Sequence, residues 1–167
     1  MQAILMAVGD DRPGLTRSLA DAIGEADGNW LESHFAHLGS KFVGSVLVEL
    51  PEAGIGRLEQ AAAAMEADGF SVSVLASAEA VPPAGRLLTF EIVGRDRPGI
   101  VREVTAALAA HSVNIEELRS AIEDGAMFGS RLFRASVRAI VPEATSLEIV
   151  RKALEDISGE IMVDIES

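Results

Sequence analysis

The stretch Gly9-Asp10-Asp11-Arg12-Pro13-Gly14-Leu15 returns as Gly94-Arg95-Asp96-Arg97-Pro98-Gly99-Ile100, displaced by 85 positions as Asp11 and Asp96 show. The same displacement relates further pairs along the chain: Arg17 and Arg102, Asn29 and Asn114, and Glu32 and Glu117. A second block that starts at Phe42 and Phe133 repeats at a displacement of 91 positions. Self-similarity at a fixed period indicates two copies of one structural unit.

The two copies differ by six residues, because the displacement changes from 85 to 91 between Asn114 and Phe133. Asp124-Gly125 lies inside this interval and is a turn signal. We therefore expect a longer hairpin in the second copy.

Hydrophobic periodicity predicts the same element order in each copy. Apolar strands at 3–8 and 87–93 are followed by helices whose apolar residues recur at i, i+4, i+7 and i+8. These residues are Leu15, Leu19, Ala22 and Ile23 in the first copy, and Ile100, Val104, Ala107 and Leu108 in the second. Two strands then flank a turn, at Gly39-Ser40 in the first copy and Asp124-Gly125 in the second.

A second helix and a closing strand complete each copy. The helices share one apolar spacing, with Ile55, Leu58, Ala62 and Met65 in the first copy and Leu147, Val150, Leu154 and Ile157 in the second. Alternating apolar residues then predict closing strands at 70–74 and 161–165. The order is βαββαβ in both copies.

This order predicts an α+β fold of two tandem ferredoxin-like βαββαβ modules, each a four-stranded antiparallel sheet with two helices on one face. Residues 77–85 contain small residues and paired prolines, which are typical of a linker. We assign residues 1–80 to the first module, 81–85 to the linker and 86–167 to the second module.

Composition narrows the class of function. The net charge is −12, with 4 basic and 12 acidic residues before Gly85 and 10 basic and 14 acidic residues after it, which disfavours direct binding of nucleic acid. No apolar stretch reaches the roughly 18 residues that a membrane helix needs, and the short N-terminal apolar run is unlike a secretory signal. The absence of cysteine fits a reducing compartment, so we expect a soluble cytoplasmic protein.

The loop between the first strand and the first helix carries the predicted binding chemistry. Proline favours the first helical position, and glycine lets a ligand approach the N–H groups of the first turn, where a carboxylate is stabilised. Asp11 and Asp96 are placed to face an ammonium group, and the amides of Asn29 and Asn114 to complete recognition of a zwitterion. The alternative is that the loop only starts a helix and each asparagine is a turn residue. The candidate ligand-binding residues are Asp11, Arg12, Pro13, Gly14, Leu15 and Asn29, and Asp96, Arg97, Pro98, Gly99, Ile100 and Asn114.

These residues resemble the ACT-domain family, whose members show a DRPG-type loop followed by an Asn-Ile start to the second strand. Residues 96–101 with Asn114-Ile115 match this pattern well, whereas Trp30 replaces the usual small aliphatic residue in the first copy. A chain of two such modules is similar to the glycine cleavage system transcriptional repressor family. The resemblance implies an amino-acid-responsive regulator that acts through a partner protein, often as a homodimer, with ligand sites between modules at the glycine loops and glycine as the ligand.

Other polar residues predict no further chemistry. Residues three apart on a strand face opposite sides, so His34 and His37 do not form a metal site. The common catalytic and phosphate-binding motifs are absent from the sequence, and we expect no catalytic residue and no cofactor. Arg131, Arg134 and Arg138 are interpreted as balancing nearby carboxylates. Three alternatives remain open: a regulatory subunit of an amino-acid metabolic enzyme, a small enzyme with an unrecognised site, and a purely structural interaction protein.

Overall fold

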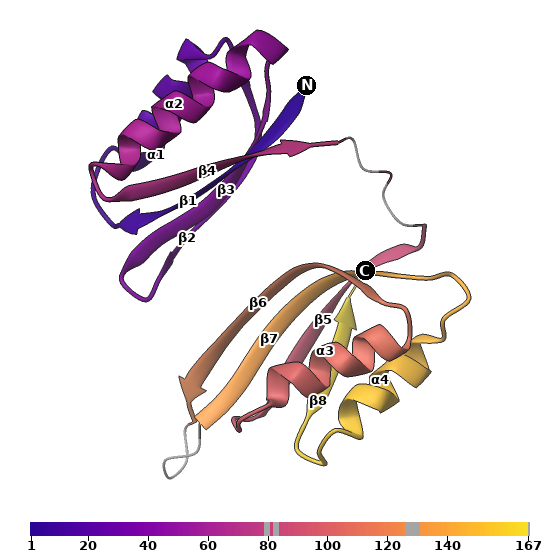
Figure 1. The fold of residues 1–167 in the computed structure, drawn as a ribbon. Coiled ribbons are helices and arrows are strands. Elements are labelled where there is room, and N and C mark those ends of the chain that lie inside the picture. The colour runs from indigo at the N-terminus through magenta and orange to yellow at the C-terminus, as the bar shows by residue number, and fades with distance from the viewer. Residues whose placement is uncertain (79–80, 82–83, 126–130, 167) are drawn as a thin grey trace. The chain divides into compact units, whose positions relative to one another are not determined.

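The computed structural model describes residues 1–78, 81, 84–125 and 131–166. The chain divides into two compact units, Met1–Ala80 and Val81–Ser167. The first contains β1 (Gln2–Asp10), α1 (Leu15–Glu25), β2 (Asn29–Leu38), β3 (Lys41–Glu49), the short 3-10 helix η1 (Glu52–Gly54), α2 (Ile55–Glu66) and β4 (Phe70–Ser77). The second contains β5 (Arg86–Arg95), α3 (Ile100–Ala110), β6 (Asn114–Asp124), β7 (Arg131–Val141), α4 (Leu147–Glu155) and β8 (Met162–Glu166) (Figure 1). The predicted βαββαβ order is confirmed in both modules.

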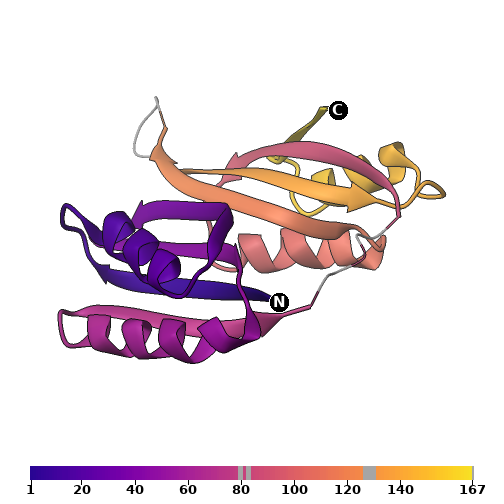
Figure 2. The same cartoon turned by 90° about the horizontal axis from the view of Figure 1, so that it is seen from above.

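Each module is built on an antiparallel sheet of four strands, in the order β2-β3-β1-β4 in the first and β6-β7-β5-β8 in the second. Two helices cover one face of each sheet, and Figure 2 shows α2 lying along β4 in the first module. The predicted ferredoxin-like class is therefore confirmed.

Burial follows the predicted periodicity because each helix turns one face to its sheet. Leu15, Leu19, Ala22 and Ile23 of α1 are all buried. In α3 the residues Ile100, Val104 and Leu108 are buried, while Ala107 is only partly covered. Ile157 lies beyond the end of α4, although its side chain still packs against the core of the second module.

The prediction that each loop proline occupies the first helical position is wrong. Neither proline occupies a first helical position, because α1 begins at Leu15 and α3 at Ile100, with Pro13 and Pro98 in the preceding turns. The capping residues are Gly14, with φ of 99°, and Gly99, with φ of 89°. Only glycine adopts this left-handed conformation readily, so the glycine is required by the backbone as well as being open to a ligand.

The predicted turn at Gly39-Ser40 is confirmed, whereas the predicted longer hairpin of the second copy lies partly outside the described residues. Gly39 and Ser40 reverse the first hairpin, and both have positive φ, as a tight two-residue turn requires. Asp124 is still paired with Arg131, so β6 continues through Asp124, where the second reversal was predicted to begin. Residues 126–130 between β6 and β7, and residues 82–83 of the predicted linker, lie outside the described residues.

Gly44 on β3 supplies a first test of packing. A Cβ atom at this position would lie 2.1 Å from Cδ1 of Phe35 and 2.6 Å from the backbone oxygen of His34. We expect Gly44→Ala to lower the free energy of unfolding of the first module by about 1–3 kcal/mol, as overpacking does. Gly56→Ala on α2, where a Cβ meets nothing within 4 Å, is the control. It should raise stability by about 0.5–1 kcal/mol in urea unfolding, because alanine favours helix more than glycine does.

Candidate ligand-binding site

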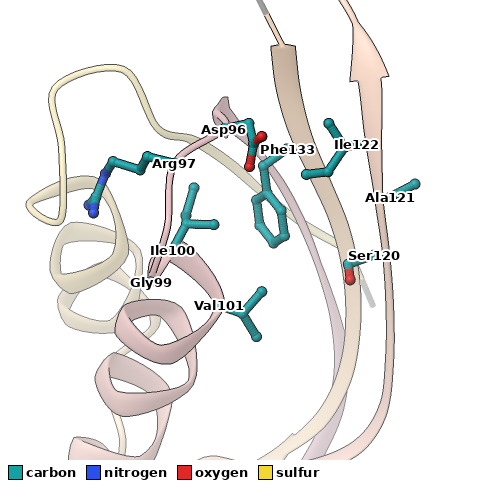
Figure 3. Close-up of a pocket in the computed structure, with 9 residues that line it drawn as sticks. All are labelled: Asp96, Arg97, Gly99, Ile100, Val101, Ser120, Ala121, Ile122 and Phe133. Atoms are coloured by element: carbon teal, nitrogen blue, oxygen red, sulfur yellow. The ribbon is translucent and has the colours of Figure 1, made fainter.

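A surface cavity of about 350 Å³ lies at the predicted loop of the second module. The loop and the start of α3 supply Asp96, Arg97, Gly99, Ile100 and Val101, and the paired strands β6 and β7 supply the opposite wall (Figure 3). That wall consists of Ser120, Ala121, Ile122 and Phe133. The fold builds the cavity because β5 delivers the loop to the same end of the sheet at which β6 ends and β7 begins.

The cavity combines polar groups with an apolar wall. The first N–H groups of a helix lack intrahelical acceptors and lie at the positive end of its dipole, so the start of α3 favours a negative ligand group. The carboxylate of Asp96 lies 3.6 Å from Nε of Arg131, and the Asp96 N–H donates to the Arg131 carbonyl at 2.9 Å. Val101 and Ile122 are each 41% exposed, which leaves apolar surface available to a ligand.

Arg97 is held away from the apolar wall. Its guanidinium donates two hydrogen bonds to Glu103 of α3, and Figure 3 shows the side chain directed away from Phe133 and β6. The hydrogen bond from Arg97 lowers the pKa of Glu103, and the same contact raises the pKa of Arg97. Arg97 thus links the loop to the beginning of α3, and its side chain is not directed into the cavity.

The Arg97–Glu103 pair predicts a pH-dependent stability. Because the pKa of folded Glu103 lies below the ordinary value of 4.5, its contribution is present above that value and is lost as pH falls through the lowered pKa. We expect Glu103→Gln to be less stable than the wild type at pH 7, and the difference to shrink as pH falls below 4.5. Thermal unfolding of both proteins at pH 7 and at pH values below 4.5 measures this. A deficit that does not decrease at any pH below 4.5 would contradict the ion pair as its source.

The asparagines lie far from the loop of their own module, so they do not contribute to a site formed within that module alone. Asn114 pairs with Ile140, which pairs with Leu87 near the start of β5, whereas the loop follows Arg95 at the other end of that strand. Eight residues of strand correspond to about 26 Å. The reason is topological, because β2 and β6 run parallel to the first strand and begin where that strand begins. Asn29 likewise pairs with Glu49, which pairs with Gln2 at the start of β1.

The loop of the first module has different surroundings. Asp11 lies 3.9 Å from Nε2 of His37, with both side chains exposed. Lys41 donates a hydrogen bond to Asp10 and thereby lowers the pKa of that carboxyl. Ser18 of α1 donates its hydroxyl to the Gly14 carbonyl at 3.2 Å. The structure places Arg12, Pro13 and Leu15 in this loop and at the helix start, as the sequence indicates.

One wall of the cavity contains residues that the sequence pattern singles out as ligand-binding candidates, and the other wall does not. Asp96, Arg97, Gly99 and Ile100 are among its lining residues, whereas Pro98 is not. Val101, Ser120, Ile122 and Phe133 were not predicted. Phe133 was noted in the sequence only because it repeats Phe42. That repeat indicated similarity between the modules and did not indicate that Phe133 lies near the loop.

Three arginines of β7 form ion pairs with nearby carboxylates. Arg131, Arg134 and Arg138 face Asp96, Glu123 and Glu117 at 3.6, 3.2 and 3.9 Å, which confirms their interpretation. Within residues 1–78, 81, 84–125 and 131–166, the structure has no group of three or more metal-ligating side chains. In the same described part of the chain, every helix is too short or too polar to span a bilayer.

Comparison with known proteins places this geometry in a family. ACT-domain family models match residues 2–72 and 88–159. A crystal structure of an unknown protein from Galdieria sulphuraria is 29% identical, covers 99% of this chain and 96% of that one, and has a TM-score of 0.80. The structure of a candidate glycine cleavage system transcriptional repressor is 16% identical, covers 99% and 98%, and has a TM-score of 0.74. No curated protein sequence matches the chain. The chain belongs to the ACT-domain family, with one ACT domain in each half.

Proposed function

We propose that this protein is an amino-acid-responsive regulator that binds its ligand at the loop 96–100 of the second module and acts through a partner protein. The observation that carries the proposal is the cavity that joins the N-terminus of α3, the carboxylate of Asp96 and an apolar wall. Membership of the ACT-domain family supports a regulatory role and amino acids as the class of ligand.

The chemistry of a free amino acid matches the groups around the cavity. Its carboxylate accepts hydrogen bonds from the N–H groups of the first turn of α3, where the helix dipole also favours negative charge. Its ammonium group pairs with Asp96, whose own partner Arg131 is a surface side chain, 63% exposed. Ser120 offers a hydroxyl as an additional donor or acceptor.

Regulation of transcription through a partner is the favoured output. A net charge of −12 opposes direct contact with a phosphate backbone, so DNA contact is assigned to the partner. The fold shared with the candidate glycine cleavage repressor supports a transcription factor as that partner and glycine as the first amino acid to test. The homodimer that the family resemblance implies and a cytoplasmic location belong to the same proposal.

The ligand half of this proposal is tested by calorimetric titration of the full chain with glycine, alanine, serine, valine, leucine and aspartate. We expect saturable binding of at least one of them. Since a two-state regulator responds only to a ligand that binds its states with different affinity, that amino acid should also change capture of a partner. Silence across the panel would contradict an independent sensor.

The partner half is tested by affinity capture of the tagged chain from cells, with and without the ligand found by titration. Recovery of a DNA-binding protein in a ligand-dependent amount is the expected result. Recovery of an amino-acid metabolic enzyme in its place would replace the transcriptional output by regulation of that enzyme in trans.

A further inference from the structure

Phe35 in the first module and Ser120 in the second occupy equivalent positions. They are 85 positions apart, as are the two loops, and the strand registers agree. His37 pairs with Phe42 as Ile122 pairs with Phe133, and two residues earlier Phe35 pairs with Gly44 as Ser120 pairs with Ala135. Paired residues in an antiparallel sheet share a face, so Phe35 lies on the same face as Phe42, and Ser120 on the same face as Phe133.

Aromatic packing occupies this position in the first module. The ring of Phe35 stacks on Phe42 with centroids 5.0 Å apart and an interplanar angle of 16°, and Trp30 contacts it with centroids 6.0 Å apart. Gly44 makes room for this ring, because a Cβ there would lie 2.1 Å from Cδ1 of Phe35. A bulky side chain and a glycine opposite it thus fill the space beside Phe42.

The second module has a small residue in place of the bulky one and a larger residue in place of the glycine. Ser120 is small, polar and exposed, and its partner Ala135 is buried at 1% exposure. No bulky side chain fills the position of Ser120, which lines the open cavity in Figure 3 together with the buried Phe133. The residues around the two loops also differ. Glu103 anchors Arg97 away from the cavity, whereas the matching helix position in the first module is Ser18. Opposite the aspartate of the loop, the first module has the polar His37 and the second has the apolar Ile122.

We infer that the two ACT domains have divided their roles: the second binds one amino acid with an aliphatic side chain, and the first, filled by Phe35, binds none at its loop. This inference rests on the proposed function and adds the stoichiometry, the module and the class of side chain. The aliphatic preference follows from Val101 and Ile122, which are each 41% exposed and which a ligand side chain would cover. Each buried methylene raises affinity about fourfold, so valine should bind on the order of 50-fold more tightly than glycine.

Calorimetry of the full chain with valine and glycine tests the inference. We expect one valine per chain. The double variant Ser120→Phe with Ala135→Gly transfers the first-module pair into the second module and should lower valine affinity at least tenfold. Asp96→Asn should do the same without any change in volume, while its counterpart Asp11→Asn should leave binding as in the wild type. Thermal unfolding of each variant verifies that both modules stay folded. If the double variant does not fold, the result for Asp96→Asn decides the test.

Each remaining outcome overturns a defined part of the account. Two valines per chain, or loss of binding in Asp11→Asn with retention in Asp96→Asn, would overturn the division of roles and leave the proposed amino-acid sensor in place. Glycine binding as tightly as valine would overturn the aliphatic preference. Absence of binding by every amino acid in the wild type would overturn the sensor, and the division of roles with it.

Discussion

Phe90→Ala should lower the free energy of unfolding of the second module by about 3–5 kcal/mol, the usual cost of removing a fully buried aromatic ring. Phe90 lies on β5 between the strands β7 and β8, and its side chain is 0% exposed. Few mutations outside a core reach this magnitude, because they leave no cavity behind.

The matched control for Phe90→Ala is Leu5→Ala, at the equivalent position of the first module. Leu5 is 1% exposed, and its core shares no residue with that of Phe90. Amide hydrogen exchange should therefore accelerate in β5 and β7 for Phe90→Ala, and in β1 and β3 for Leu5→Ala. Equal acceleration of both modules by either variant would show that they unfold as one unit.

Gly99→Val should abolish most amino-acid binding, with a loss of affinity of at least about tenfold. A β-branched residue does not tolerate a φ of 89°, and the strain, about 1–3 kcal/mol, is relieved by moving the loop. That movement displaces the N–H groups at the start of α3 from the cavity. Calorimetry with the amino acid that binds the wild type most tightly measures the loss.

Gly14→Val is the control for Gly99→Val, because Gly14 has a φ of 99° and nothing within 4 Å of a Cβ placed there. Both variants should lose similar stability, since the backbone strain is alike. Only Gly99→Val should lose binding. Equal losses of binding would assign the ligand to both loops.

The element order and the core were readable from the sequence because hydrophobic periodicity is local. The repeat doubled that information, since each strand and helix was indicated twice. Leu15, Leu19, Ala22 and Ile23 are buried because a helix presents every third or fourth residue to one face. Helix starts were less predictable, because Pro13-Gly14 fits both a first turn and a turn before the helix, and the left-handed φ of Gly14 decides for the latter.

The candidate site was predicted only in part because its second wall comes from distant strands. The loop 96–100 is a contiguous motif, whereas Ser120 and Phe133 reach it through the register of β6, β7 and β5. Asn114 lies at the opposite end of its sheet from the loop of its own module, a separation that its short distance from the loop in the sequence does not reveal. The contrast of Phe35 with Ser120 was visible in the repeat, yet its meaning required the pairing with Gly44 and Ala135.

The central claim is that an amino acid binds at the glycine loop of the second module. An NMR titration of the ¹⁵N-labelled chain with valine tests it most directly, because the amides of Gly99, Val101 and Ser120 report on the cavity and those of Gly14 and Phe35 on its counterpart. The account predicts saturable shifts of the first three signals and none of the last two. Shifts confined to Gly14 and Phe35, or no shift of any signal at saturating valine, would contradict it.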